Sequence, residues 1–112
     1  AIVHRKLSRA GINRIVPLLS LIIKQGVEEG VFTTPYPEQT ARMIAVLRDD
    51  FGTATAELYL SKADPTSTIQ EVTQRANATM DALERLLGVK SGSLPRTSGE
   101  ELAQWTPDKP NV

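Results

Sequence analysis

Apolar residues recur in the first part of the chain at intervals of three and four positions, which is the spacing of one face of an α-helix. The pattern predicts a helix over about residues 8–29. Its apolar positions are Ile12, Ile15, Val16, Leu18, Leu19, Leu21, Ile22, Ile23 and Val27. Because they cover most of the circumference over residues 15–23, we expect this helix to be buried on more than one side.

A second helical pattern spans about residues 37–60. Its apolar stripe consists of Ala41, Ile44, Leu47, Phe51, Ala54 and Leu58, and a more polar stripe holds Met43, Val46, Asp50 and Glu57. Gly52 lies in the middle of the pattern, where glycine costs about 1 kcal/mol relative to alanine. The four residues after it are all small: Thr53, Ala54, Thr55 and Ala56. This stretch predicts either a close approach by another helix or a weak point in this one.

The third pattern is the most regular and ends near residue 87. Its stripe consists of Ile69, Val72, Ala76, Met80, Leu83 and Leu87. Ala78, Ala82 and Leu86 form a neighbouring face on which two of the three side chains are small. Ser67 with Gln70, or Thr68 with Glu71, has the spacing of a capping box at the start of this helix.

Proline and glycine mark where these helices bend or end. Pro17 either kinks the first helix or lies in its first turn after a break near Arg14. Gly30 and Gly88 follow the first and third helices, and glycine readily adopts the left-handed conformation that ends a helix. The whole pattern predicts an all-α fold, an antiparallel helical bundle of about three long helices.

Loop-forming residues dominate the end of the chain. They are Ser91, Gly92, Ser93, Pro95, Thr97, Ser98, Pro107 and Pro110. We therefore expect one domain over residues 1–88, followed by a tail over residues 89–112 that is partly disordered or forms one short helical turn. Ser98 and Glu101 are spaced to cap a turn through residues 102–105, and Trp105 either docks on the bundle or stays mobile.

The composition limits what the domain can be. A chain of 112 residues buries roughly 60–68% of the surface that its unfolded form exposes, so its core is thin. An oligomer or a neighbouring domain is expected to cover the apolar surface left over. The chain has no cysteine, which excludes disulfides and thiolate chemistry. Since it begins with Ala1 rather than Met, we interpret it as a fragment or a trimmed form of a longer protein.

Charge is distributed unevenly, although the formal net charge is zero. Residues 1–27 contain no acid, and their basic residues are Arg5, Lys6, Arg9, Arg14 and Lys24. This pattern favours a solvated helix face beside an acidic neighbour, and the alternatives are a transit peptide or a membrane-surface helix. The longest apolar stretch, residues 15–23, is interrupted and falls short of the ~20 residues that a membrane span needs. We expect a cytoplasmic protein.

The residues that carry chemistry in enzymes are sparse. His4 is the only histidine and has no partner at a metal-ligand or triad spacing. Asp49 and Asp50 are adjacent, so on a helix they point about 100° apart and do not form a carboxylate pair. The segment over residues 26–30 has two glycines, but it ends a helix and lacks a phosphate-binding lysine. We expect no metal, no cofactor and no enzymatic activity.

Three short segments are informative when they are taken together and in order. They are IIKQGVEEGVF at residues 22–32, PEQTARMI at residues 37–44 and ALERLLG at residues 82–88. Together they resemble the C-terminal domain of TetR-family transcriptional regulators, over about residues 12–88. None of the three is a catalytic signature, so the resemblance depends on their occurring together at these intervals.

The resemblance implies a repressor that works as a homodimer. The second and third helices would pair with their copies in a four-helix interface, while the first helix would lie beside a pocket for a small apolar ligand. The ligand would favour one spacing of the subunits and so shift the DNA-binding heads on the operator. We expect these helix-turn-helix heads, and the helices that complete the pocket, to lie outside this chain.

The candidate interface follows from the stripes of the second and third helices, because one face can serve the monomer core and another can serve a partner. The candidate residues are Ile44, Leu47, Ala54, Leu58, Val72, Ala76, Thr79, Ala82, Leu83 and Leu86. The alternative is that both stripes belong to the core of a monomer.

The candidate ligand residues are chosen for their apolarity alone. They are Ile15, Leu19 and Ile22 on the first helix, with Phe51 opposite. A competing hypothesis is a helical protein–protein interaction module with neither a ligand nor a DNA role. A basic helix-turn-helix pattern upstream of Ala1 would separate the two, and binding to anionic vesicles would favour the membrane-surface alternative.

Overall fold

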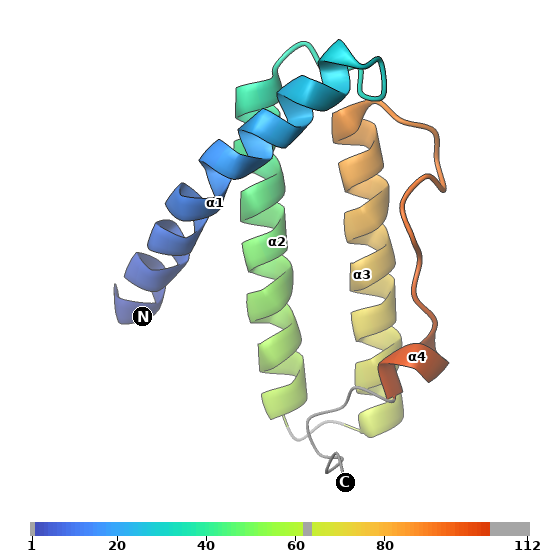
Figure 1. Ribbon diagram of the computed structural model, residues 1–112. Helices are drawn as coiled ribbons and strands as arrows, with labels where there is room; N and C mark the ends of the chain where they lie inside the picture. Colours follow the sequence, from blue (N-terminus) through green and yellow to red (C-terminus); the bar gives the residue numbers. More distant parts are fainter. Residues whose placement is uncertain (1, 62–63, 104–112) are drawn as a thin grey trace, which may run out of the picture.

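The computed structural model describes residues 2–61 and 64–103. These residues form three long helices, α1 (Ile2–Glu28), α2 (Pro37–Leu60) and α3 (Pro65–Leu87), and the short helix α4 (Gly99–Ala103). Helices α2 and α3 lie side by side and antiparallel, α1 crosses α2 at an angle, and α4 packs beside the start of α3 (Figure 1). The described part of the chain contains no strand, which confirms the predicted all-α fold.

Helix α1 is longer than predicted and continuous. It begins at Ile2, six residues before the predicted start at Ser8, and it runs through Pro17 without a break. Proline removes one backbone hydrogen bond, but its fixed φ is helical. Val16 and Leu19, on either side of Pro17, pack against the core and hold the flanking turns in place. Of the two alternatives for Pro17, the break near Arg14 is therefore wrong.

The ends of α2 and α3 follow elementary capping chemistry. Both helices begin with a proline at the first helical position, where the missing N–H has no partner to lose. The cap of α3 is Asp64, whose carboxylate accepts a hydrogen bond from the backbone N–H of Ser67 at 3.0 Å. The two predicted capping boxes at Ser67 and Thr68 are wrong, because the helix starts at Pro65.

The core lies at one end of the bundle, where the end of α1, the start of α2 and the end of α3 meet. Its buried members are Ile23 of α1, Ala41 and Ile44 of α2 and Leu87 of α3. Partly buried side chains surround them: Val16, Leu19, Val27, Phe32, Leu83, Leu86 and Val89. Each helix contributes one side of its apolar stripe, so the core fixes how the three helices meet.

Two left-handed glycines shape this end of the bundle. Gly30 has φ 78° and Gly88 has φ 71°, as predicted for residues that end helices. After Gly88 the end of α3 docks on the loop between α1 and α2: the N–H of Thr33 donates to the carbonyl of Leu87 at 3.0 Å, and its hydroxyl donates to the carbonyl of Gly88 at 3.0 Å. The loop thereby joins the end of α3 to the end of α1.

After α3 the chain turns back along that helix (Figure 1). We call residues 89–98 the return segment. It leads into α4, where the N–H of Glu101 donates to the hydroxyl of Ser98 at 3.2 Å, so the predicted cap is confirmed. The helical turn that Ser98 caps begins at Gly99. Trp105 lies outside the described residues.

The chain is extended for its size. Its radius of gyration is 15.9 Å, against about 13 Å for a compact domain of this length. Its accessible surface is 8177 Å², against about 6,000 Å² for a compact monomer of this mass. Among the described residues, no helix combines the length and the apolar character that crossing a membrane requires.

Candidate functional site

A groove runs between α1 and α2, on the side where the two helices diverge from the core. It has a volume of about 790 Å³, within the range of small-molecule sites. We call it the α1–α2 groove. It is lined by His4, Gly11, Ile12, Arg14, Ile15 and Leu18 of α1, and by Ala45, Arg48, Asp49, Gly52, Thr53 and Ala56 of α2.

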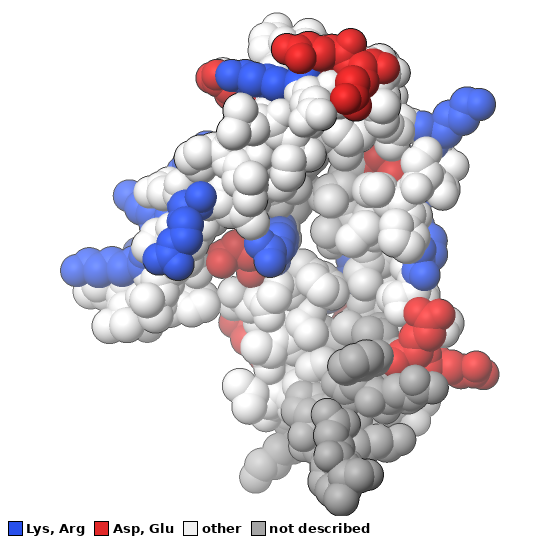
Figure 2. Space-filling model, viewed as in Figure 1, with Lys and Arg blue, Asp and Glu red and all other residues white. Residues whose placement is uncertain are grey.

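The groove combines an apolar floor with charged edges. Ile12, Ile15 and Leu18 are its large apolar residues, and small residues of α2 such as Ala45 and Gly52 line the opposite wall. Arg14 comes from one wall, whereas Arg48 and Asp49 come from the other. Figure 2 shows basic side chains gathered over α1, with basic and acidic side chains meeting where α1 and α2 diverge.

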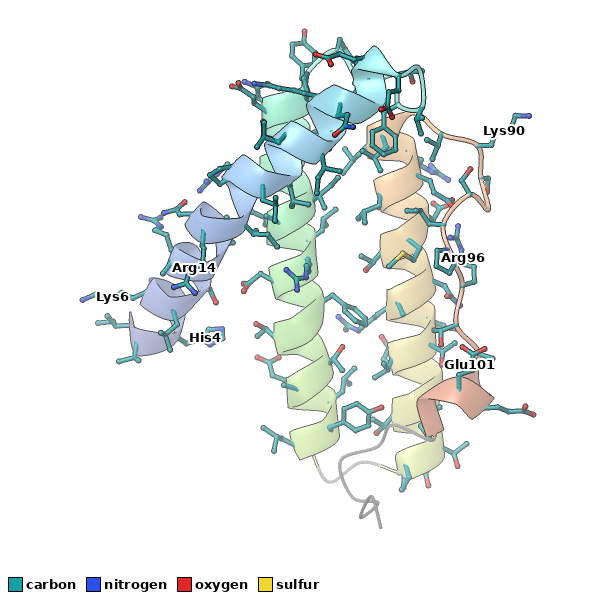
Figure 3. All side chains as sticks on the ribbon, in the orientation of Figure 1. His4, Lys6, Arg14, Lys90, Arg96 and Glu101 are labelled. Carbon is teal, nitrogen blue, oxygen red and sulfur yellow. The ribbon has the colours of Figure 1, made fainter. Side chains whose placement is uncertain are left out.

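A second groove of about 670 Å³ continues from the first toward the start of α1, and the two share His4, Ile12, Asp49 and Thr53. His4 points from α1 toward α2 (Figure 3), and its Nε2 lies 3.4 Å from the hydroxyl oxygens of both Ser8 and Thr53. The histidine therefore joins the two walls of the groove by hydrogen bonding.

The structure does not bring the four predicted ligand residues together. Ile15 lines the α1–α2 groove, but Leu19 packs against the core. Ile22 is 49% exposed. Phe51 lines a different groove, between α2 and α3. An apolar side chain on α1 or α2 can face the core, the groove or solvent, and apolarity alone does not separate these three places.

Helices α2 and α3 also carry two adjoining grooves, which are lined by both apolar and polar side chains. One groove of about 640 Å³ is lined by Gln39, Arg42, Met43, Val46, Leu47 and Leu86. A smaller one of about 250 Å³ is lined by Leu47, Asp50, Phe51, Arg75, Ala78, Thr79 and Ala82. Leu47 belongs to both, so they join into one surface, which we call the α2–α3 face. Met43 and Val46 are 50% and 45% exposed there.

The predicted interface residues divide between this face and the interior. Leu47, Thr79, Ala82 and Leu86 line the α2–α3 face. Ile44 and Val72 are only 7% and 1% exposed, so these two are monomer core and their prediction as interface residues is corrected. Leu83 is partly buried and, like Leu86, packs against the core. Ala54, Leu58 and Ala76 are partly buried. Their stripes turn inward because α2 and α3 pack on each other.

Sequence analysis missed Glu84, the largest fully buried side chain. Its carboxylate accepts hydrogen bonds from the backbone N–H groups of Gly92 at 3.0 Å and Leu94 at 2.8 Å, and from the guanidinium of Arg96 at 2.7 Å and 3.1 Å. These contacts, that with Arg96 first, lower the pKa of Glu84 to about 2. The signal in the sequence that could have indicated this role is an acidic residue that lies among Leu83, Leu86 and Leu87.

Asn77 lies two turns before Glu84 on α3 and contacts the same segment. Its amide donates to the carbonyl of Thr97 at 3.1 Å and accepts from the N–H of Thr97 at 3.0 Å. Figure 3 shows Arg96 on the return segment, beside α3. Two polar side chains of α3 thus hold the return segment against the helix, on a different side from the α2–α3 face.

In the part of the chain that the structure describes, no group of three or more His, Asp or Glu side chains converges. The remaining ion pairs join exposed side chains. Lys24 meets Glu38 at 2.6 Å, and this hydrogen bond lowers the pKa of Glu38. The two grooves and the α2–α3 face are candidate binding features.

Comparison with known proteins identifies the first part of the chain. Residues 1–68 match a family described as "Tetracyclin repressor-like, C-terminal domain". The match covers α1, α2 and the start of α3, which is more than half of the chain. No curated protein and no solved structure matches the chain.

Proposed function

Because the chain belongs to the tetracyclin repressor-like C-terminal domain family, we propose that it is the ligand-sensing and homodimerisation domain of a cytoplasmic TetR-like transcriptional repressor. In this proposal, DNA-binding heads carried by another part of the polypeptide contact the operator. A small molecule bound by this domain shifts their spacing, since it binds one arrangement of the two subunits better than the other.

The observation that carries the pairing is the α2–α3 face. It exposes Met43 and Val46 beside the partly buried Leu47 and Leu86. Ala78, Thr79 and Ala82 continue it on α3 with short side chains that let a partner helix approach closely. A twofold axis through this face would place α2 and α3 of one subunit against α2 and α3 of the other, as a self-complementary contact.

The surface area of the chain supports the same conclusion. The chain exposes roughly 2,000 Å² more than a compact monomer of its mass. Obligate homodimers bury about 2,000–5,000 Å² in total, which is about 1,000–2,500 Å² per subunit. A dimer through the α2–α3 face can therefore remove a large part of this excess from water.

The ligand part of the proposal rests on the α1–α2 groove and on the position of α2. Ala45, Arg48 and Gly52 of α2 face the groove, whereas Met43 and Val46 of the same helix face the proposed partner. A ligand that changes the angle between α1 and α2 would move the side of α2 that forms the interface. This is the mechanical link that sensing requires.

Sedimentation equilibrium over a range of concentrations tests the pairing. We expect the wild-type chain to dimerise, and we expect Val46→Glu and Ala82→Arg each to weaken the dimer at least tenfold. Each places a charge on the twofold face, where it is desolvated and lies near its own copy. Val3→Glu and Ala10→Arg are matched controls on exposed positions of α1 and should leave the association unchanged.

A wild-type chain that stays monomeric at all concentrations would refute the pairing. So would face variants that associate as strongly as the controls. A stable dimer that responds to no small molecule would instead be the behaviour of a plain helical interaction module.

A further inference from the structure

The lining of the α1–α2 groove carries more positive than negative charge, because it contains two arginines and one aspartate. The two arginines of its lining come from opposite walls, Arg14 from α1 and Arg48 from α2. Within residues 2–61 and 64–103, the ion pairs formed are Lys24–Glu38, Arg75–Glu71, Arg85–Asp81 and Arg96–Glu84. Arg14 and Arg48 belong to none of them.

The excess of positive charge extends along the neighbouring groove. The basic residues that line the two grooves are Arg5, Lys6, Arg9, Arg14, Arg42 and Arg48, and the acidic ones are Asp49 and Asp50. Arg42 is held by the amide oxygen of Asn13 at 3.2 Å. Because the walls are of low polarity and the charges are mostly of one sign, their field attracts anions into the groove.

The floor would accept an apolar body. Leu18 lines the groove and is 58% exposed, so an apolar ligand that covers it removes apolar surface from water. Gly11 and Gly52 stand on the two walls, and a methyl group added at either would meet no atom within 4 Å. The space between α1 and α2 is therefore open where a ligand chain would lie.

From these observations we propose that the α1–α2 groove binds an amphipathic anion, a small molecule with an apolar chain or ring system and one anionic head. The apolar part lies on Ile12, Ile15 and Leu18, and the head is bound by Arg14 and Arg48 from opposite walls. Guanidinium groups suit this role, since they pair with carboxylate or phosphate oxygens in a bidentate way. The inference rests on the ligand-sensing function proposed above and specifies its ligand class.

An ion pair across the groove also has a structural consequence. A head that engages both arginines draws α1 and α2 together, whereas a neutral ligand of the same length does not. The charge of the head then determines the angle between the helices. A change in this angle moves α2, and α2 forms part of the proposed dimer face.

Isothermal titration calorimetry on the 112-residue chain tests the ligand class. The probes are octanoate, octyl phosphate, 1-octanol and acetate. We expect octanoate or octyl phosphate to bind at least tenfold more tightly than 1-octanol, acetate to bind undetectably, and added salt to weaken the anions only. The octanoate and octyl phosphate arms distinguish a carboxylate head from a phosphate head.

Variants locate the site. Arg14→Gln with Arg48→Gln should lower the affinity for the anionic probe at least tenfold and leave that for 1-octanol unchanged. Arg85→Gln is the matched control, because Arg85 lies on α3 outside the groove, and it should change neither. Gly52→Leu should block both probes by filling the groove. Circular dichroism of each variant confirms that the helices are retained.

Three results would overturn the proposal. The first is equal binding of 1-octanol and octanoate, which would leave an apolar sensing site and remove the anion class. The second is unchanged octanoate binding by the double arginine variant. The third is no binding of any probe by a chain that sedimentation shows to be dimeric, which would refute the anion site and leave the pairing intact.

Discussion

At the scale of single residues, Gly26 shows how the absence of a side chain determines the way α1 joins the loop that follows it. It is buried in α1, and its carbonyl accepts hydrogen bonds from the N–H groups of Val31 at 2.8 Å and Phe32 at 3.1 Å. The ring of Phe32 folds back so closely that a Cβ at residue 26 would collide with it. Glycine is therefore required at Gly26 for packing, whereas at Gly30 it is required for a left-handed φ.

We expect Gly26→Ala to lower the free energy of unfolding by about 1–3 kcal/mol, because the new methyl group must displace the Phe32 ring. Gly11→Ala is the control in the same helix. Its Cβ would meet nothing within 4 Å, and alanine raises helix stability by about 1 kcal/mol over glycine. Urea denaturation of both variants measures the difference. Equal effects of the two substitutions would show that the Phe32 contact is unimportant.

At the scale of elements, α3 is held from two sides. One side packs on α2, and another holds the return segment through Asn77 and Glu84. The buried carboxylate of Glu84 satisfies two backbone N–H groups and one guanidinium, which compensates for its removal from water. The return segment is thereby part of the folded domain, although its composition is that of a loop.

This contact predicts a pH dependence. The pKa of Glu84 is lowered from 4.5 to about 2 in the folded chain, so its ionised form stabilises the fold. That contribution is complete above the unfolded pKa and is lost as the pH falls from 4.5 toward 2. We expect the wild type to be more stable than Glu84→Gln at pH 6, and the difference to shrink steadily below pH 4.5.

Thermal denaturation of both proteins from pH 6 to pH 2.5 measures this difference, with Glu38→Gln as the control. Glu38 also has a lowered pKa, but its ion pair with Lys24 is exposed and screened by solvent, so it should contribute little. A constant difference between wild type and Glu84→Gln across the range would mean that the carboxylate charge does not hold the return segment.

At the scale of the whole molecule, the core is small and lies at one end. Ile23, Ala41, Ile44 and Leu87 join three helices there, while the start of α1 extends away from the α2–α3 pair (Figure 1). The α1–α2 groove lies away from this core, where the start of α1 diverges from α2.

Because the core is small, each core residue should matter for global stability. We expect Ile23→Ala to cost about 2–5 kcal/mol, since Ile23 is 2% exposed and its removal leaves a cavity. Ile22→Ala, at the adjacent and 49% exposed position, should cost less than about 1 kcal/mol. Chemical denaturation at one fixed protein concentration measures both, because dimerisation would add to the apparent stability. Similar losses for the two variants would place the core elsewhere.

The sequence by itself determined the elements of this protein. Apolar spacing identified α1, α2 and α3, Pro37 marked the start of α2, and Gly30 and Gly88 marked two ends, because these signals are local properties of the backbone and of helix faces. The quoted segments also indicated the family, which the match over residues 1–68 confirms.

The tertiary structure alone decided which neighbour each face meets. It placed Ile44 and Val72 in the core, separated Ile15 from Phe51, and left Met43 and Val46 exposed. An apolar stripe predicts that a helix face is buried, but it does not indicate which element covers that face. Burial of Glu84 depends on donors eight to twelve residues away, Gly92, Leu94 and Arg96, which come together only when the return segment folds onto α3.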